Sequence, residues 1–243
     1  MRDRWVGNIG DFGKLALLRH LTADRRLAVC WYITGRTGED TNSERYFDYL
    51  QRPEEFRHLA PEVFDALSAI EGDRRNRYPR LTALEASGLL GDALFHSRSV
   101  PRRASLREMW AKELVESVDK ADLVFLDPDN GLQGKRLTPK HVALYEVAAL
   151  RRPDRALMIV QRQSGRRFEA RYLAECLQSL GCRPIELIRF RLVSSRFYVI
   201  ADHDETMSER IASFARKWGN WVKTYGFSSA ISWGLDTAVS LFQ

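Results

Sequence analysis

The chain has 243 residues, of which 44% are hydrophobic and 29% are charged. These proportions are ordinary for one large globular domain and exclude wholesale disorder. The formal net charge of +6 favours a polyanionic partner over a chance excess of basic residues, and nucleic acid, as RNA or DNA, is the partner we consider first.

The three cysteines indicate a reducing compartment. Cys30, Cys176 and Cys182 are odd in number, lack a C-x-x-C spacing and stand in apolar strand or helix patterns. This is typical of buried thiols rather than of disulfides or metal ligands. No window approaches the ~18 apolar residues of a membrane span, and the first residues lack the apolar core of a signal peptide. We therefore expect a cytoplasmic protein without a membrane partner.

The first third of the chain predicts a helix, a strand and a helical insertion. Residues 11–22 carry apolar side chains at helical spacing behind Asp11, which we expect to cap the helix. The run "RLAVCWYIT" (26–34) is typical of a buried strand. Residues at about 46–91 hold helix-like stretches broken by prolines, which we interpret as an insertion rather than a separate domain.

The rest of the chain predicts alternating strands and helices that end in a hairpin. The expected strands are 93–100, 122–127 and 156–161, and the expected helices are 105–118, 138–151, 166–180 and 206–222. Five residues separate "PIELIRF" from "RFYVIAD", too few for a crossover, so these strands should be antiparallel. We expect a single α/β domain over residues 1–243, with a Rossmann-like, mostly parallel sheet, helices on both faces and this hairpin closing the sheet.

The stretch "DLVFLDPDNGL" places polar groups at the end of a buried strand. Ligands of doubly wound sheets collect at the carboxyl ends of the strands, so Asp127, Asp129 and Asn130 are our candidate catalytic residues. A tight turn also favours Pro-Asp-Asn-Gly. Two carboxylates two positions apart are more than such a turn requires.

A second candidate is "GNIGDFGK", where Asn8, Asp11 and Lys14 stand three residues apart around a helix start. The positive end of a helix dipole disfavours a lysine. A lysine at this position is explained if it contacts an anion there. The alternative is a solvated lysine behind an N-cap. Further along, "YITGRTGED" offers Gly35 and Gly38 as a sparse glycine loop after the first strand.

The order of elements resembles that of class I S-adenosylmethionine-dependent methyltransferases. The segment "VGNIGDFGKLALL" is similar to the N-terminal G-N-x-x-D-x-x-K segment of the large-subunit ribosomal RNA adenine N6-methyltransferases. That family also has a helical insertion after its first strand. Asp127-Pro128 matches the first half of the family's D-P-P-Y motif, which ends a central strand. Asp129 and Asn130 stand in place of the second proline and the aromatic residue.

This resemblance implies methyl transfer from S-adenosylmethionine to an amine of a nucleic acid. Asp127 would orient the amine, and Asp129 would accept a proton or bind a ligand. The aromatic residue that would stack on the base is missing from the motif. No metal site is expected under this interpretation. The cofactor-binding residues that the resemblance implies are Asn8, Asp11, Lys14, Gly35 and Gly38.

Basic residues follow the strand predicted at 156–161. Arg162, Arg166 and Arg167 lie on the side of the sheet where the site is expected. We consider them candidates for contacts with nucleic-acid phosphates, and solvated loop residues are the alternative.

Two other functions fit parts of the sequence. The stretch "VFLDPDNGL" also resembles the hhhhD-x-D motif of haloacid-dehalogenase-like phosphatases. That resemblance implies a Mg²⁺-dependent phosphohydrolase, with Asp127 as nucleophile and Asp129 as acid and base. The sparse glycine loop and the missing aromatic residue favour instead a non-catalytic nucleic-acid-binding module on the same fold.

Overall fold

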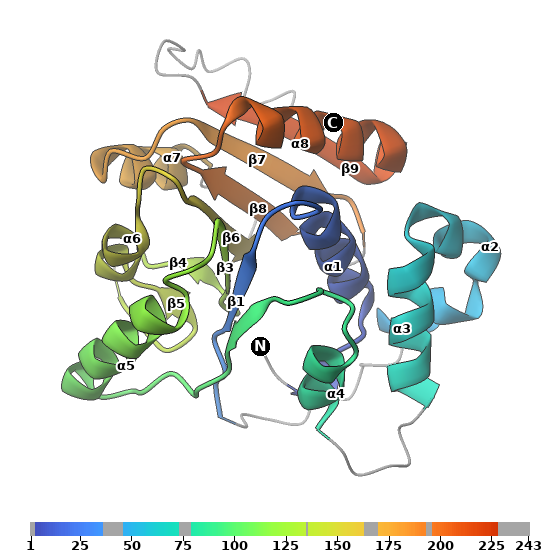
Figure 1. Ribbon diagram of the computed structural model, residues 1–243, viewed down its shortest axis with the longest axis horizontal. Helices are drawn as coiled ribbons and strands as arrows, with labels where there is room; N and C mark the ends of the chain where they lie inside the picture. Colours follow the sequence, from blue (N-terminus) through green and yellow to red (C-terminus); the bar gives the residue numbers. More distant parts are fainter. Residues whose placement is uncertain are drawn as a thin grey trace.

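The central sheet contains seven strands within residues 3–35, 46–72, 79–134, 136–162, 170–192 and 196–227, which are those that the computed structural model describes. The strands lie in the order β2-β1-β3-β6-β8-β7-β9 (Figure 1). They are β1 (Leu27–Trp31), β2 (Leu94–His96), β3 (Leu123–Asp127), β6 (Ala156–Arg162), β7 (Ile185–Phe190), β8 (Arg196–Ala201) and β9 (Val222–Phe227).

The strand directions confirm the predicted fold class. Strands β2, β1, β3 and β6 are parallel neighbours. Strand β8 lies antiparallel between β6 and β7, so the predicted hairpin follows the parallel strands, and β9 lies beyond it at the edge of the sheet. A separate short pair, β4 (Gly131–Leu132) with β5 (His141–Val142), lies outside this sheet.

Helices cover both faces of the sheet. One face carries α1 (Ile9–Leu21) and α8 (Glu205–Trp218), and the other carries α5 (Ala104–Ser117), α6 (Leu144–Leu150) and α7 (Ala170–Ser179). The predicted insertion is helical and follows β1, as η3 (Asp48–Gln51), α2 (Pro53–Phe56), η4 (Arg57–Leu59), α3 (Pro61–Gly72) and α4 (Arg80–Ala86). Figure 1 shows α2, α3 and α4 on the side of α1, opposite α5 and α6. Two single turns, η1 (Asp3–Trp5) and η5 (Gly219–Trp221), complete the helical elements of the described residues.

Each central strand contributes to two apolar cores because both of its faces are covered. In β1, Val29 and Trp31 belong to the core under α1 and α8, whereas Ala28 and Cys30 belong to the core under α5, α6 and α7. This alternation explains why the sequence of β1 is continuously apolar.

Several boundaries differ from the prediction. Helix α6 begins at Leu144 rather than at residue 138, because the residues before it form β5 and pair with β4. Helix α8 ends at Trp218 rather than at 222, and Gly219, with a φ of +52°, follows it. Strand β9, which pairs with β7, was not predicted.

Candidate active site

The carboxyl ends of β1 and β3 lie side by side. Trp31 pairs with Asp127 in the parallel register, so the last residues of the two strands are level. Thr34 and Asp129 follow these strands, and Thr34 Oγ1 donates a hydrogen bond to Asp129 Oδ2 at 3.1 Å. This is the edge at which doubly wound sheets bind their ligands.

The first turn of α1 contains the residues of the second predicted motif. Asn8 caps the helix, because its Oδ1 accepts the N–H groups of Gly10 at 2.7 Å and of Asp11 at 3.3 Å. The prediction that Asp11 is the cap is wrong. Asp11 lies inside the first turn, where its Oδ2 accepts the N–H of Gly7 at 3.1 Å. Gly7 has a φ of +92°, a conformation that glycine adopts readily.

Lys14 connects this helix to the end of β3. Its Nζ lies 2.7 Å from Asp11 Oδ1 and 3.0 Å from Asp127 Oδ2, and its side chain is fully buried. The ammonium also lies 5.0 Å from the centre of the Trp31 ring, within range of a cation–π contact. Two buried carboxylates therefore share one buried cation.

Lys14 is the main one of the positive charges that keep Asp127 ionised. Burial of the Asp127 carboxyl works to raise its pKa, but nearby positive charges, chiefly that of Lys14, outweigh burial and lower the pKa below its usual value. Asp127 is therefore an ionised hydrogen-bond acceptor at neutral pH.

Asn130 is bonded to the segment that precedes α6. Its backbone N–H donates to the Lys140 carbonyl at 2.9 Å, and its side-chain amide lies 3.5 Å from His141 Nε2. Of the three predicted catalytic residues, Asp127 thus contacts α1, Asp129 contacts the segment after β1, and Asn130 contacts β5.

Gly131 fixes the direction of the chain after the predicted catalytic residues. It has a φ of +102°, and a Cβ at this position would overlap Gln161 Oε1 at the end of β6. The same oxygen accepts the N–H of Leu132 at 3.0 Å. The backbone conformation requires glycine here, and a Cβ would in addition displace the end of the Gln161 side chain.

A buried charge network that was not predicted from the sequence holds the segment between β4 and α6. Arg107 Nε donates to Glu146 Oε1 at 2.7 Å, and the Tyr32 hydroxyl donates to Glu146 Oε2 at 2.9 Å. The Arg107 guanidinium also donates to the carbonyls of Thr138 and His141, at 2.9 and 2.6 Å. The network ties β1 and α5 to the segment between β4 and α6. A glutamate in the apolar stretch of α6 is the one local sign of it in the sequence.

Of the other predicted site residues, Gly35 and Arg162 lie within the described ranges. Gly35 is exposed, and a Cβ there would meet nothing within 4 Å. Arg162 is the last residue of β6 and pairs with the first residue of β8. The predicted residues that lie outside the described ranges are Gly38, Arg166 and Arg167.

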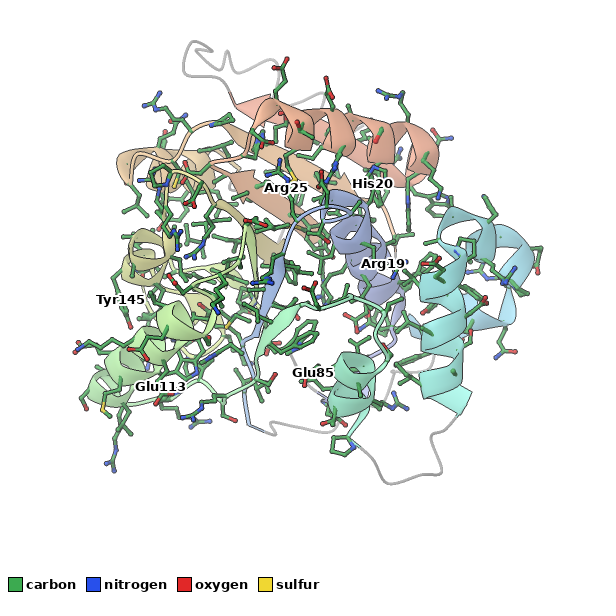
Figure 2. The ribbon with its side chains drawn as sticks, viewed as in Figure 1. Arg19, His20, Arg25, Glu85, Glu113 and Tyr145 are labelled. Carbon is green, nitrogen blue, oxygen red and sulfur yellow. The ribbon has the colours of Figure 1, made fainter. Side chains whose placement is uncertain are left out.

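Two cavities lie elsewhere on the protein. One, of about 600 Å³, is lined by α1, η4, α3 and α8, and includes His20 and Lys217. There His20 Nε2 lies 2.8 Å from Ser213 Oγ, and Arg19 of the same helix pairs with Glu62 (Figure 2). The other, of about 660 Å³, lies near the starts of β1 and β3. Neither of these two cavities is lined by a predicted site residue.

No protein-family model and no curated protein sequence matches the chain. Among the described residues, no helix has both the length and the apolar character needed to cross a membrane.

Proposed function

We propose that this chain binds S-adenosylmethionine at the carboxyl ends of β1 and β3 and methylates an amine of a nucleic acid. The observation that carries the proposal is the 3.0 Å contact between Lys14 Nζ and Asp127 Oδ2. These residues belong to the two motifs that resemble the adenine N6-methyltransferases, and 113 positions separate them. A contact between the two motifs is what a common site would require.

The charges at this edge fit the cofactor. The carboxylates of Asp11, Asp127 and Asp129 and the cations Lys14 and Arg196 place charges of both signs at this edge. Such a site suits a ligand that itself carries charges of both signs. S-adenosylmethionine is such a ligand, and when bound it supplies a methyl group on a positively charged sulfur.

Asp127 has the properties of an amine-orienting residue. Its ionised carboxylate can accept a hydrogen bond from the N–H of the substrate, and Lys14 holds that carboxylate in a fixed position. Asp129 is half-buried and bonded to Thr34 at the same edge, and we assign it the proton that the amine releases. The chain would thus act mainly by positioning and electrostatics.

Tyr172 supports a substrate with unpaired bases. It lies in the first turn of α7, is 38% exposed, and its hydroxyl donates to the Gln133 carbonyl at 3.0 Å. An exposed aromatic ring close to the segment after β3 is a surface on which a base can stack. The net charge of +6 favours the same class of substrate.

The test is transfer of a labelled methyl group. The full chain is incubated with methyl-labelled S-adenosylmethionine and total RNA or DNA, and the digested nucleosides are separated. We expect a labelled methylamino base, and we expect Asp127→Asn to lower the rate by about 10²-fold. Asp154→Asn is the matched control, because Asp154 is an exposed carboxylate that pairs with Arg152 at the surface.

Three outcomes would count against this function. One is the absence of label from every nucleic acid together with absence of cofactor binding. Another is Mg²⁺-dependent hydrolysis of phosphate esters that Asp127→Asn abolishes, which would favour the phosphohydrolase. The third is salt-sensitive binding of nucleic acid with neither activity, which would favour the binding module.

A further inference from the structure

Arg196 is a charged residue of the site that the sequence analysis did not identify. It is the first residue of β8, and its backbone pairs with the last residues of β6 and β7. Among the described residues its guanidinium has neither a hydrogen-bond partner nor an ion-pair partner. The side chain is half-buried.

The guanidinium of Arg196 lies against the first turn of α1. A Cβ built on Gly10 would lie 3.8 Å from Arg196 Nε and 3.9 Å from its Cζ. Gly10 lies two positions after the cap residue Asn8 and directly before Asp11. Arg196 is therefore next to the same helix start that supplies Lys14 to Asp127.

Carboxylates surround Arg196 at a distance. Burial of its guanidinium works to lower its pKa, but Tyr198 and the carboxylates of Asp127, Asp11 and Asp129 outweigh burial and raise it. Lys14 lies in the same cluster and adds a second cation. The guanidinium is thus held in a site that contains charges of both signs.

Lys14 and Asn8, which the resemblance implies at the cofactor, are already engaged within the protein. Lys14 is fully buried between two carboxylates, and Asn8 caps α1. The guanidinium N–H groups of Arg196, by contrast, can donate hydrogen bonds to a ligand. The planar fork of a guanidinium matches a carboxylate with two parallel hydrogen bonds.

We propose that Arg196 binds the carboxylate of the amino-acid end of the cofactor, with the carboxylate of Asp129 facing its ammonium group. This inference rests on the proposed function. Charge complementarity supports it: the amino-acid end of the cofactor carries one carboxylate and one ammonium, and the cluster offers a cation to the first and a carboxylate to the second. A phosphate group has no cation to offer Asp129.

The test compares two nucleosides that differ in the amino-acid end. S-adenosylhomocysteine carries that end, and 5′-methylthioadenosine lacks it. Calorimetry with the full chain should show that Arg196→Gln weakens binding of S-adenosylhomocysteine by about 10- to 100-fold and leaves binding of 5′-methylthioadenosine unchanged. Arg196→Lys, which keeps the charge but not the fork, should have an intermediate effect. Arg191→Gln, at an exposed position just after β7, should leave both affinities unchanged.

The outcomes separate this inference from the proposed function. If the unaltered chain binds both nucleosides and Arg196→Gln binds S-adenosylhomocysteine equally well, the role of Arg196 is overturned and the cofactor site stands. Equal weakening of both nucleosides also overturns it, since Arg196 would then shape the whole site. If Arg196→Gln weakened the binding of RNA and of neither nucleoside, Arg196 would bind a phosphate of the nucleic acid instead of the cofactor. If the unaltered chain binds neither nucleoside, the proposed function fails as well.

Discussion

Lys14 Nζ lies 3.0 Å from Asp127 Oδ2, and both side chains are almost completely buried. This ion pair joins the first helix to the end of a central strand, and the same ammonium lies 2.7 Å from Asp11 Oδ1. The pair therefore has two consequences, one for the stability of the fold and one for the ionisation of the candidate catalytic carboxylate.

Lys14→Met should destabilise the protein more than Asp127→Asn. Loss of the lysine leaves the carboxylates of Asp11 and Asp127 buried without their cation, and removal of one partner of a buried pair costs about 3–5 kcal/mol. Loss of the Asp127 charge leaves Lys14 paired with Asp11, so the cost is smaller. Urea denaturation of the two variants measures the difference.

The double variant Lys14→Met with Asp127→Asn tests the pairing itself. Lys14→Met leaves two buried carboxylates without a cation, whereas the double variant leaves only that of Asp11. We therefore expect the double variant to be more stable than Lys14→Met alone, with a coupling free energy of about 1–3 kcal/mol. Losses that simply add would show that the two residues are not energetically coupled.

The stability contributed by Asp127 should disappear in acid. Its folded-state pKa lies below the unfolded value of about 4, so its contribution is fully present above that value and is lost as the pH falls through the folded pKa. Between pH 6 and pH 3 the unfolding free energy should therefore fall more steeply for the unaltered chain than for Asp127→Asn. Parallel curves for the two proteins would contradict the shift.

Gly131→Ala should cost about 2 kcal/mol or more. The new alanine must adopt a φ of +102°, and its Cβ displaces Gln161 Oε1, which accepts the N–H of Leu132. Gly134→Ala is the matched control, because a Cβ there meets nothing within 4 Å. Thermal unfolding of both variants measures the cost, and equal melting temperatures would show that Gly131 is not required.

Arg107→Met should destabilise the protein by about 3–5 kcal/mol, because it leaves the buried carboxylate of Glu146 without its cation. The amides of 138–143 should also exchange faster with solvent, since their segment loses two hydrogen bonds. Arg98→Met removes an exposed pair with Glu113 and should cost less than about 1 kcal/mol. Equal losses for the two variants would contradict a structural role for the network.

The sequence predicted the central strands well because their patterns are local. The apolar runs that contain β1 and β3 and the short link between β7 and β8 each indicate one structure. The cap of α1 was misplaced because Asn8 and Asp11 are both good caps, and the choice between them depends on Lys14, which draws Asp11 into an ion pair.

The sequence predicted that Asp127 ends a strand and that Lys14 lies near a helix start, but it did not predict the contacts that these residues make. The contacts of Asp127 with Lys14 and of Tyr32 with Glu146 join residues 113 and 114 positions apart. Arg196 stands at a strand start with no local pattern that marks it. Such long-range contacts depend on how the whole chain packs, so a local sequence pattern does not predict them.

A crystal structure of the chain with S-adenosylhomocysteine tests the proposed cofactor site most directly. We expect the nucleoside beyond the carboxyl ends of β1 and β3, with its amino-acid carboxylate about 2.7–2.9 Å from the Arg196 guanidinium. A ligand bound elsewhere, such as in the cavity between α1 and α8, or no ligand at saturating concentration, would contradict the account.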